Sequence, residues 1–289
     1  MTRETSIAGR MRPFARGTMA IALVLGGLAG TACDDMDGDG DIAIFEQQGR
    51  CNVQMSTRQA GGMSFTLFVP SGGTGCTGPF PVVGWGNGSL TNTGSYTAFL
   101  TNVASHGLTV VSANTSNANG AAIFGGDGTT KVDDAIALGL SLPNVGTRAC
   151  AMGYSQGGAG AVRAARMDDR VVCTVGIAAE IFFTGPANAQ GLARTVFLGG
   201  SADIVAPVGT NSQVLFNQAG APKVLAVIAG ADHFQPLGDA GNYRGPAIAA
   251  LVLNLRPNDP DAAAAGRLIN NDALANDPRI SAFTRQGTF

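Results

Sequence analysis

The chain has few charged residues and few histidines. Charged side chains make up 13% of its 289 residues against 45% for hydrophobic ones, the formal net charge is −2, and only two histidines are present. No stretch interleaves lysine or arginine with aromatic residues, so the basic surface of a nucleic-acid-binding protein is not expected. This composition predicts a sizeable buried core in one folded domain with an N-terminal appendage. We therefore expect a small or neutral substrate.

Signatures of metal and phosphate sites are also missing. The five cysteines and two histidines show no zinc-ligand spacing, and no glycine-rich loop carries a phosphate-binding lysine. Asp35, Asp37, Asp39 and Glu46 do match the spacing of an EF-hand calcium loop, but the place of the entering helix falls in residues 1–32, which we expect to be a signal peptide. The favoured interpretation of this segment is an acidic spacer, and we expect no cofactor.

The apolar run near the N-terminus, residues 19–28, is too short to form a permanent transmembrane helix. Four arginines within the first 16 residues precede an apolar run over 19–28, four small residues and then Cys33. This order is typical of a signal peptide and resembles a bacterial lipoprotein signal. We predict that residues 1–32 are removed and that Cys33 is lipidated at an outer membrane or cell surface. Simple cleavage and release into the periplasm or medium is the alternative.

Export makes the other four cysteines candidates for two disulfides. Of the three possible pairings, we favour Cys51 with Cys76 and Cys150 with Cys173. The first pair would join the N-terminal strands, and the second would join two apolar segments that we expect to be neighbouring strands. Buried free thiols are the alternative.

The chain predicts an α/β fold after a short acidic tether. We assign residues 33–41 to the tether and 42–289 to the folded domain. Strand-like apolar runs alternate with helical patterns, which indicates a mainly parallel central sheet with helices on both faces. Strands are expected at residues 64–69, 81–85, 108–113, 147–152, 171–177, 195–198 and 223–228. Helices are expected at residues 96–105, 131–140, 156–167, 208–219 and 244–255.

Ser155 is the candidate nucleophile. It lies in Gly153-Tyr154-Ser155-Gln156-Gly157, where an expected strand meets an expected helix. A nucleophile elbow requires this strand–turn–helix context and small residues two positions before and after the serine. A plain glycine-rich turn is the alternative, because the chain contains 42 glycines.

A serine hydroxyl needs a base to take its proton, and His233 is the only histidine that follows Ser155 in the chain. The order nucleophile, acid, base is that of the α/β-hydrolases, and His233 comes directly after the expected strand 223–228. His106 precedes the serine at the end of an expected helix, and we interpret it as a C-terminal cap.

The acid that orients the base is predicted to be Asp203, which follows the expected strand 195–198. Asp232 is a competitor, but its place next to His233 makes a bond to the far ring nitrogen awkward. We expect Asp232 to stabilise its own loop. Glu180 is a weaker competitor, one strand too early.

Residues 81–233 resemble the cutinase-like polyester hydrolases of bacteria, the α/β-hydrolase group that contains poly(ethylene terephthalate) hydrolases and is similar to the dienelactone hydrolases. The most specific of the shared motifs is the acid motif, Asp203 followed by Ala206-Pro207. The matching segments are Asn87-Gly88-Ser89, Ala104-Ser105-His106-Gly107, Gly153-Tyr154-Ser155-Gln156-Gly157, Asp203-Ile204-Val205-Ala206-Pro207 and Gly230-Ala231-Asp232-His233.

The resemblance implies an oxyanion hole formed by the backbone amides of Ser89 and Gln156. It also implies that Tyr154 lines the substrate site. The family has a tryptophan in the loop after the strand that follows the nucleophile elbow, and Phe182 or Phe183 is the residue of this chain nearest to that position. Ser89 stands where the family usually has an aromatic residue.

The connection between the strands ending near residue 177 and starting at residue 195 is too short for a cap domain, so an open cleft is expected. These features predict a monomeric, exported serine carboxylic ester hydrolase, cutinase- or polyesterase-like, acting on an ester or polyester. An esterase or lipase for soluble or glyceride esters is one alternative, and a non-catalytic surface-binding α/β module is another.

Overall fold

The computed structural model describes residues 38–115, 129–181 and 187–289, and these residues belong to one compact unit. Within the described residues a single mixed sheet has the strand order β1-β2-β4-β3-β5-β6-β7-β8-β9. The six strands from β4 to β8 in this order pair in parallel, whereas β1, β2 and β9 pair antiparallel. The strands are β1 Val53–Ala60, β2 Met63–Pro70, β3 Phe80–Gly86, β4 Thr109–Ala113, β5 Val145–Tyr154, β6 Val171–Ile177, β7 Thr195–Gly200, β8 Lys223–Ile228 and β9 Ile280–Gln286.

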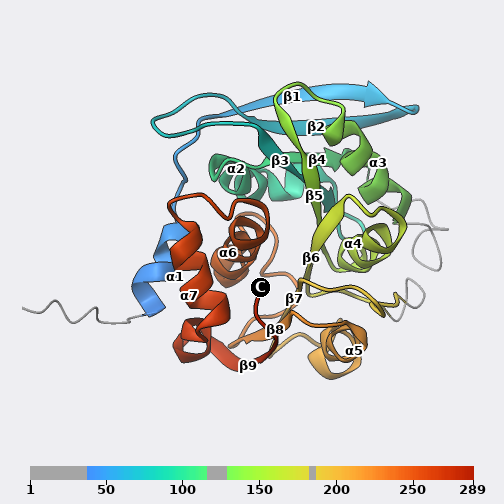
Figure 1. Cartoon of the computed structure of the whole chain (residues 1–289). Coiled ribbons are helices and arrows are strands. Elements are labelled where there is room, and N and C mark those ends of the chain that lie inside the picture. The colour runs from blue at the N-terminus through green and yellow to red at the C-terminus, as the bar shows by residue number, and fades with distance from the viewer. Residues whose placement is uncertain (1–37, 116–128, 182–186) are drawn as a thin grey trace, which may run out of the picture. The chain divides into compact units, whose positions relative to one another are not determined.

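Helices cover both faces of the sheet, as the alternating pattern predicted. Figure 1 shows α1, α2, α6 and α7 on one face and α3, α4 and α5 on the other, and the buried apolar clusters divide in the same way. The α-helices are α1 Gly38–Glu46, α2 Thr97–Ser105, α3 Thr129–Leu140, α4 Gln156–Met167, α5 Ser212–Gln218, α6 Arg244–Leu255 and α7 Ala262–Asn270. The prediction of an α/β protein with a mainly parallel sheet is therefore confirmed.

The central strands form where the sequence has continuous apolar runs. Every residue of β3, Phe80-Pro-Val-Val-Gly-Trp-Gly86, is buried, and so is every residue of β8. A parallel strand covered on both faces needs apolar side chains at all positions rather than at alternate ones. All seven expected strands are present, each within two residues of its expected ends.

The acidic segment differs from the expectation of a tether that ends at residue 41. Helix α1 already begins at Gly38, and its side chains Ile42 and Phe45 are buried against α6 and α7. Asp41 forms an ion pair with Arg267 at 2.6 Å, and Glu46 forms one with Arg279 at 2.6 Å. The predicted boundary between tether and folded domain at residue 41 is therefore wrong. Asp41 and Glu46 lie on helix α1, and their ion pairs with distant arginines attach this helix to the folded domain.

Besides α1, two strands and one α-helix were not predicted, and one predicted helix is divided. Strands β1 and β9 are polar, largely exposed edge strands, and helix α7 follows a proline- and aspartate-rich turn. The expected helix 208–219 is split at Asn211, with φ −127° and ψ −88°, into a 3₁₀ turn and α5.

Both predicted disulfides are present. Cys51 is bonded to Cys76, and Cys150 is bonded to Cys173. Cys150 and Cys173 are register partners on the adjacent strands β5 and β6, so the second bond links two central strands. Two disulfides indicate an oxidising, exported environment.

In the described part of the chain, no helix combines the length and the apolar character needed to cross a bilayer. Cys33 and the predicted signal peptide lie outside the described residues.

The two disulfides are expected to differ in their resistance to reduction. Cys76 is half-buried, whereas Cys150 and Cys173 are only 0% and 1% exposed. A thiolate must reach a sulfur atom to open the bond, so dithiothreitol should open Cys51–Cys76 first in the folded protein. Timed alkylation with peptide mass spectrometry measures the order. Equal rates for both bonds without denaturant would contradict the expectation.

Candidate active site

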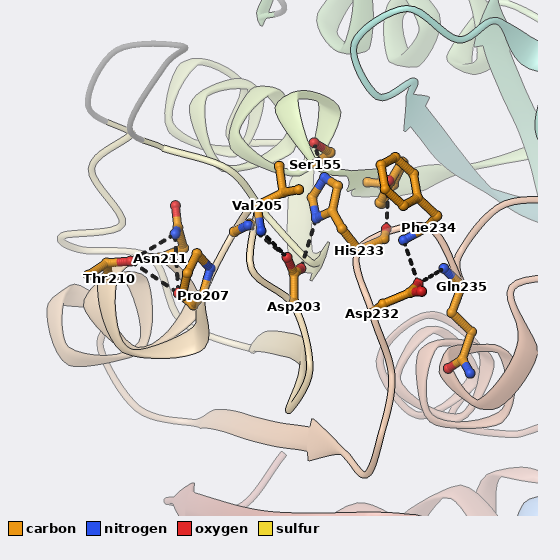
Figure 2. Close-up of polar contacts among 12 residues, drawn as sticks. Ser155, Asp203, Val205, Pro207, Thr210, Asn211, Asp232, His233, Phe234 and Gln235 are labelled. Carbon is orange, nitrogen blue, oxygen red and sulfur yellow. Dashed lines mark hydrogen bonds and ion pairs between the residues drawn. The ribbon is translucent and has the colours of Figure 1, made fainter.

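Ser155, Asp203 and His233 meet at the carboxyl ends of three parallel strands. They follow β5, β7 and β8 in turn, and such strand ends share one edge of the sheet. The Ser155 Oγ lies 2.9 Å from His233 Nε2, and His233 Nδ1 lies 2.8 Å from Asp203 Oδ2. Figure 2 shows the three side chains in a continuous row. All three residues are buried, at 5–6% exposure.

The backbone at Ser155 is strained and firmly held. The residue has φ 54° and ψ −121°, a conformation that non-glycine residues rarely adopt. Its N–H donates to the carbonyl of Ile177 at 2.9 Å, and its own carbonyl accepts from Gly158 N at 2.9 Å and Glu180 N at 3.0 Å. These bonds compensate for the strain and aim the hydroxyl at His233.

The two glycines of the Ser155 motif are sterically required. A Cβ atom at Gly153 would collide with the Gly157 carbonyl, and one at Gly157 would collide with the Gly86 carbonyl on β3. The close approach of β5, α4 and the end of β3 therefore leaves no room for a side chain. This is the physical reason for small residues on both sides of the serine.

Asp203 is fixed as an ionised acceptor. Its Oδ1 accepts from the amides of Val205 at 2.9 Å and Ala206 at 2.7 Å, which leaves Oδ2 for His233. Burial raises the pKa of Asp203, but the bond from His233 and these two amides outweigh it, so the pKa lies below its usual range. A carboxylate at Nδ1 holds the proton on that nitrogen and leaves Nε2 as the acceptor for the serine proton.

The competing residues have other positions. Asp232 is exposed, and its Oδ1 accepts from the amides of Phe234 at 2.9 Å and Gln235 at 3.0 Å, as Figure 2 shows. It stabilises its own loop, as expected. Glu180 is buried after β6, one strand before Asp203.

His106 is the C-cap residue of α2, as predicted, with Nε2 3.2 Å from the Gln47 carbonyl. Burial holds the pKa of His106 below its usual value.

The loop after β3 meets the start of α4 beside Ser155. The Ser89 hydroxyl donates to Gln156 Oε1 at 2.8 Å. Asn87 anchors this loop, because its side chain accepts from Trp85 Nε1 at 2.9 Å and donates to the Ala113 carbonyl at 2.7 Å. Gln156 is the first residue of α4, where backbone amides point out of the helix end. The two amides predicted as an oxyanion hole thus belong to adjacent segments, and their role stays a prediction.

Tyr154 has a different place from the one expected. It was predicted to line the substrate site, but it is 3% exposed and its hydroxyl donates to the His233 carbonyl at 2.7 Å. Side chains alternate along a strand, so the residue before the outward-facing elbow points into the core. Phe182 and Phe183 lie outside the described residues.

Exposed apolar side chains occur in the loops that carry the predicted site residues, and no sequence motif predicted them. We define the apolar rim as Leu90, Ile204, Val205 and Phe234, each within two residues of a predicted site residue. Leu90 is 68%, Ile204 90% and Phe234 61% exposed, and Leu90 adopts a left-handed backbone with φ 62°. In Figure 2 the Val205 and Phe234 side chains lie on either side of the His233 imidazole. Apolar residues in loops directly beside motif residues are the signal that could have revealed the rim.

The arrangement can activate a hydroxyl group. An imidazole between a serine and a carboxylate can accept the serine proton and be stabilised as a cation. Among the described residues, no group of three or more histidine, cysteine or acidic side chains could hold a metal ion. No protein-family model matches the sequence, and no curated protein matches it either.

Proposed function

We propose that the protein is a serine carboxylic ester hydrolase with an α/β-hydrolase fold, similar to the cutinase-like polyester hydrolases. The single observation that carries the proposal is the row of hydrogen bonds from Ser155 through His233 to Asp203, at 2.9 and 2.8 Å. The strained backbone at Ser155 and the parallel strands that precede all three residues support it. So does the chain order nucleophile, acid, base.

The reaction proceeds through an acyl-enzyme. Ser155 Oγ attacks the ester carbonyl carbon while His233 Nε2 takes the serine proton. The carbonyl oxygen becomes an oxyanion facing the amides of Ser89 and Gln156. The tetrahedral intermediate then breaks its C–O bond, and the alcohol leaves with the proton from His233. A water molecule attacks the acyl-serine in the same way, and the carboxylic acid leaves as the proton returns to Ser155.

The apolar rim favours esters that are presented by an apolar surface, such as a polyester, over freely soluble ones. Isolated exposed apolar residues are ordinary, but a group around a reactive site suggests a binding surface. Four of the six large hydrophobic side chains that are exposed in the described residues belong to this rim. An esterase or lipase for soluble or glyceride esters is the second candidate. Export, with or without a lipid on Cys33, would bring the enzyme to such a substrate.

Ester turnover tests the proposal. We expect the purified protein to hydrolyse p-nitrophenyl butyrate and to release acid from an aliphatic polyester film. Phe234→Ser should lower the rate on the film roughly tenfold, because one buried phenyl group contributes about 1.5 to 3 kcal/mol to binding. It should change the rate on p-nitrophenyl acetate much less.

Met167→Ser is the matched control, since Met167 is 70% exposed at the far end of α4 and outside the rim. Equal losses on film and acetate would contradict the surface-binding role of the rim. Failure to hydrolyse any ester would contradict the enzyme proposal, and film binding without turnover would favour the non-catalytic surface-binding module.

A further inference from the structure

The three tyrosines of the chain, Tyr96, Tyr154 and Tyr243, are all buried. Burying a hydroxyl group is costly unless it forms a hydrogen bond. The Tyr96 and Tyr154 hydroxyls are bonded, whereas that of Tyr243 has no hydrogen-bond partner within the residues that the structure describes. The two bonded hydroxyls both reach loops of the candidate active site.

Tyr154 contacts three parts of that site. It is the covalent neighbour of Ser155, and its hydroxyl donates to the His233 carbonyl at 2.7 Å. Its ring centroid lies 5.2 Å from that of the His233 imidazole. Its ring also packs against Gly88, where an added Cβ atom would lie 2.7 Å from Cδ1 and Cε1 of the tyrosine. One side chain therefore touches the segments that carry the nucleophile, the base and the predicted oxyanion amide of Ser89.

Tyr96 extends this contact to the loop after β3. The Gly88 amide donates to the Tyr96 hydroxyl at 3.2 Å, and the hydroxyls of Tyr96 and Thr91 are 2.6 Å apart. The rings of Tyr96 and Tyr154 pack with centroids 5.9 Å apart. The backbone of Gly88 is thus held by a hydrogen bond on one side and by the Tyr154 ring on the other.

Among the described residues, the other hydrogen bonds to the backbone of the His233 loop lie on either side of His233. The Gly230 amide donates to Ser201 Oγ at 2.8 Å, and the Ala231 carbonyl accepts from Ala202 N at 3.0 Å. Asp232 bonds the two amides that follow His233. The bond from Tyr154 reaches the backbone of His233 itself. Because Tyr154 is attached to Ser155, this bond links the backbones of nucleophile and base through a single side chain.

We propose that Tyr154 is a positioning residue, whose hydroxyl holds the His233 backbone so that the imidazole stays within proton-transfer distance of Ser155. This inference rests on the proposed function and deepens it. Small errors in the placement of a base are costly, since proton transfer needs heavy atoms about 3 Å apart. Burial raises the pKa of the Tyr154 phenol well above its ordinary value, so the hydroxyl remains a protonated donor throughout the working pH range.

Tyr154→Phe tests the inference, because it removes only the hydroxyl and keeps the ring that packs on Gly88. We expect kcat for p-nitrophenyl butyrate to fall about threefold to tenfold, the usual effect of losing one hydrogen bond. KM should stay within about twofold, because substrate contacts are unchanged. The downfield proton NMR signal of His233 Nδ1–H should broaden, and it is assignable because the chain has only two histidines.

Tyr243→Phe is the matched control, because it also removes a buried tyrosine hydroxyl. It should leave kcat and the NMR signal as in the wild type. An unchanged kcat and signal in Tyr154→Phe would overturn the inference, as would equal effects of the two variants. If the wild type hydrolyses no ester, the proposed function fails, and the NMR comparison still decides whether Tyr154 positions His233.

Discussion

Replacing Ser155 with alanine is expected to lower kcat/KM for p-nitrophenyl butyrate by about 10⁴- to 10⁶-fold. The variant keeps the fold, because the small alanine fits where the serine side chain lies, but it loses the only atom that can form the acyl-enzyme. His233 then has no proton to accept at 2.9 Å from its Nε2. Any remaining rate would come from water and from electrostatic stabilisation of the oxyanion.

Covalent capture gives an independent measurement of the same change. A fluorophosphonate probe should label the wild type once, on the peptide that contains Ser155, and should not label Ser155→Ala. Ser56→Ala, an exposed position on edge strand β1, serves as the control and should be labelled like the wild type. Equal labelling of Ser155→Ala would show that the nucleophile has been assigned to the wrong residue.

Asp203→Asn is expected to lower kcat by about 10³- to 10⁴-fold with little change in fold. The amide is nearly the shape of the carboxylate, but it carries no charge to stabilise the imidazolium that forms when His233 accepts the serine proton. It can also present an NH₂ group to His233 and so favour the wrong tautomer. The carboxylate that is lost is ionised in the native protein, since its pKa is held below the usual range.

Asp232→Asn is the matched control for the acid. This variant removes the carboxylate of the residue that precedes His233 in the chain. The Asp232 side chain bonds only the amides of its own loop, so kcat should stay within about twofold. Steady-state kinetics on both variants, with circular dichroism as the check of folding, measures the difference. A large loss in Asp232→Asn together with near-normal activity in Asp203→Asn would reverse the assignment.

The buried parallel strands and the helices between them could be predicted from the sequence. β3 and β8 are short, continuous apolar runs with a turn signal at each end, and such runs have no stable place except inside a covered sheet. The disulfide between Cys150 and Cys173 followed from the same reasoning, because their segments were expected to be neighbours. The polar edge strands β1 and β9 carry no such pattern, so only pairing with β2 and β8 defines them.

The candidate site was predictable to the extent that it depends on local geometry and chain order. Gly153 and Gly157 mark the tight approach around Ser155, and the presence of two histidines left His233 as the only base after the serine. Tyr154 was misplaced because its role was carried over from the family resemblance, whereas the alternation of side chains along β5 turns it into the core. The apolar rim was missed because isolated apolar residues in loops are common and become a surface only when distant loops converge.

By itself, the sequence determined the α/β architecture and the order of the three polar residues, and it favoured the two disulfide pairs that the structure contains. These features depend on periodicity, on small residues at a sharp turn and on which strands follow one another. Only the tertiary structure decided that Asp203, rather than Asp232, contacts His233, and that Tyr154 joins the backbone of the base to that of the nucleophile. Such contacts join residues 30 and 79 positions apart. They depend on which strand ends are adjacent and on the paths of the loops, which no local pattern specifies.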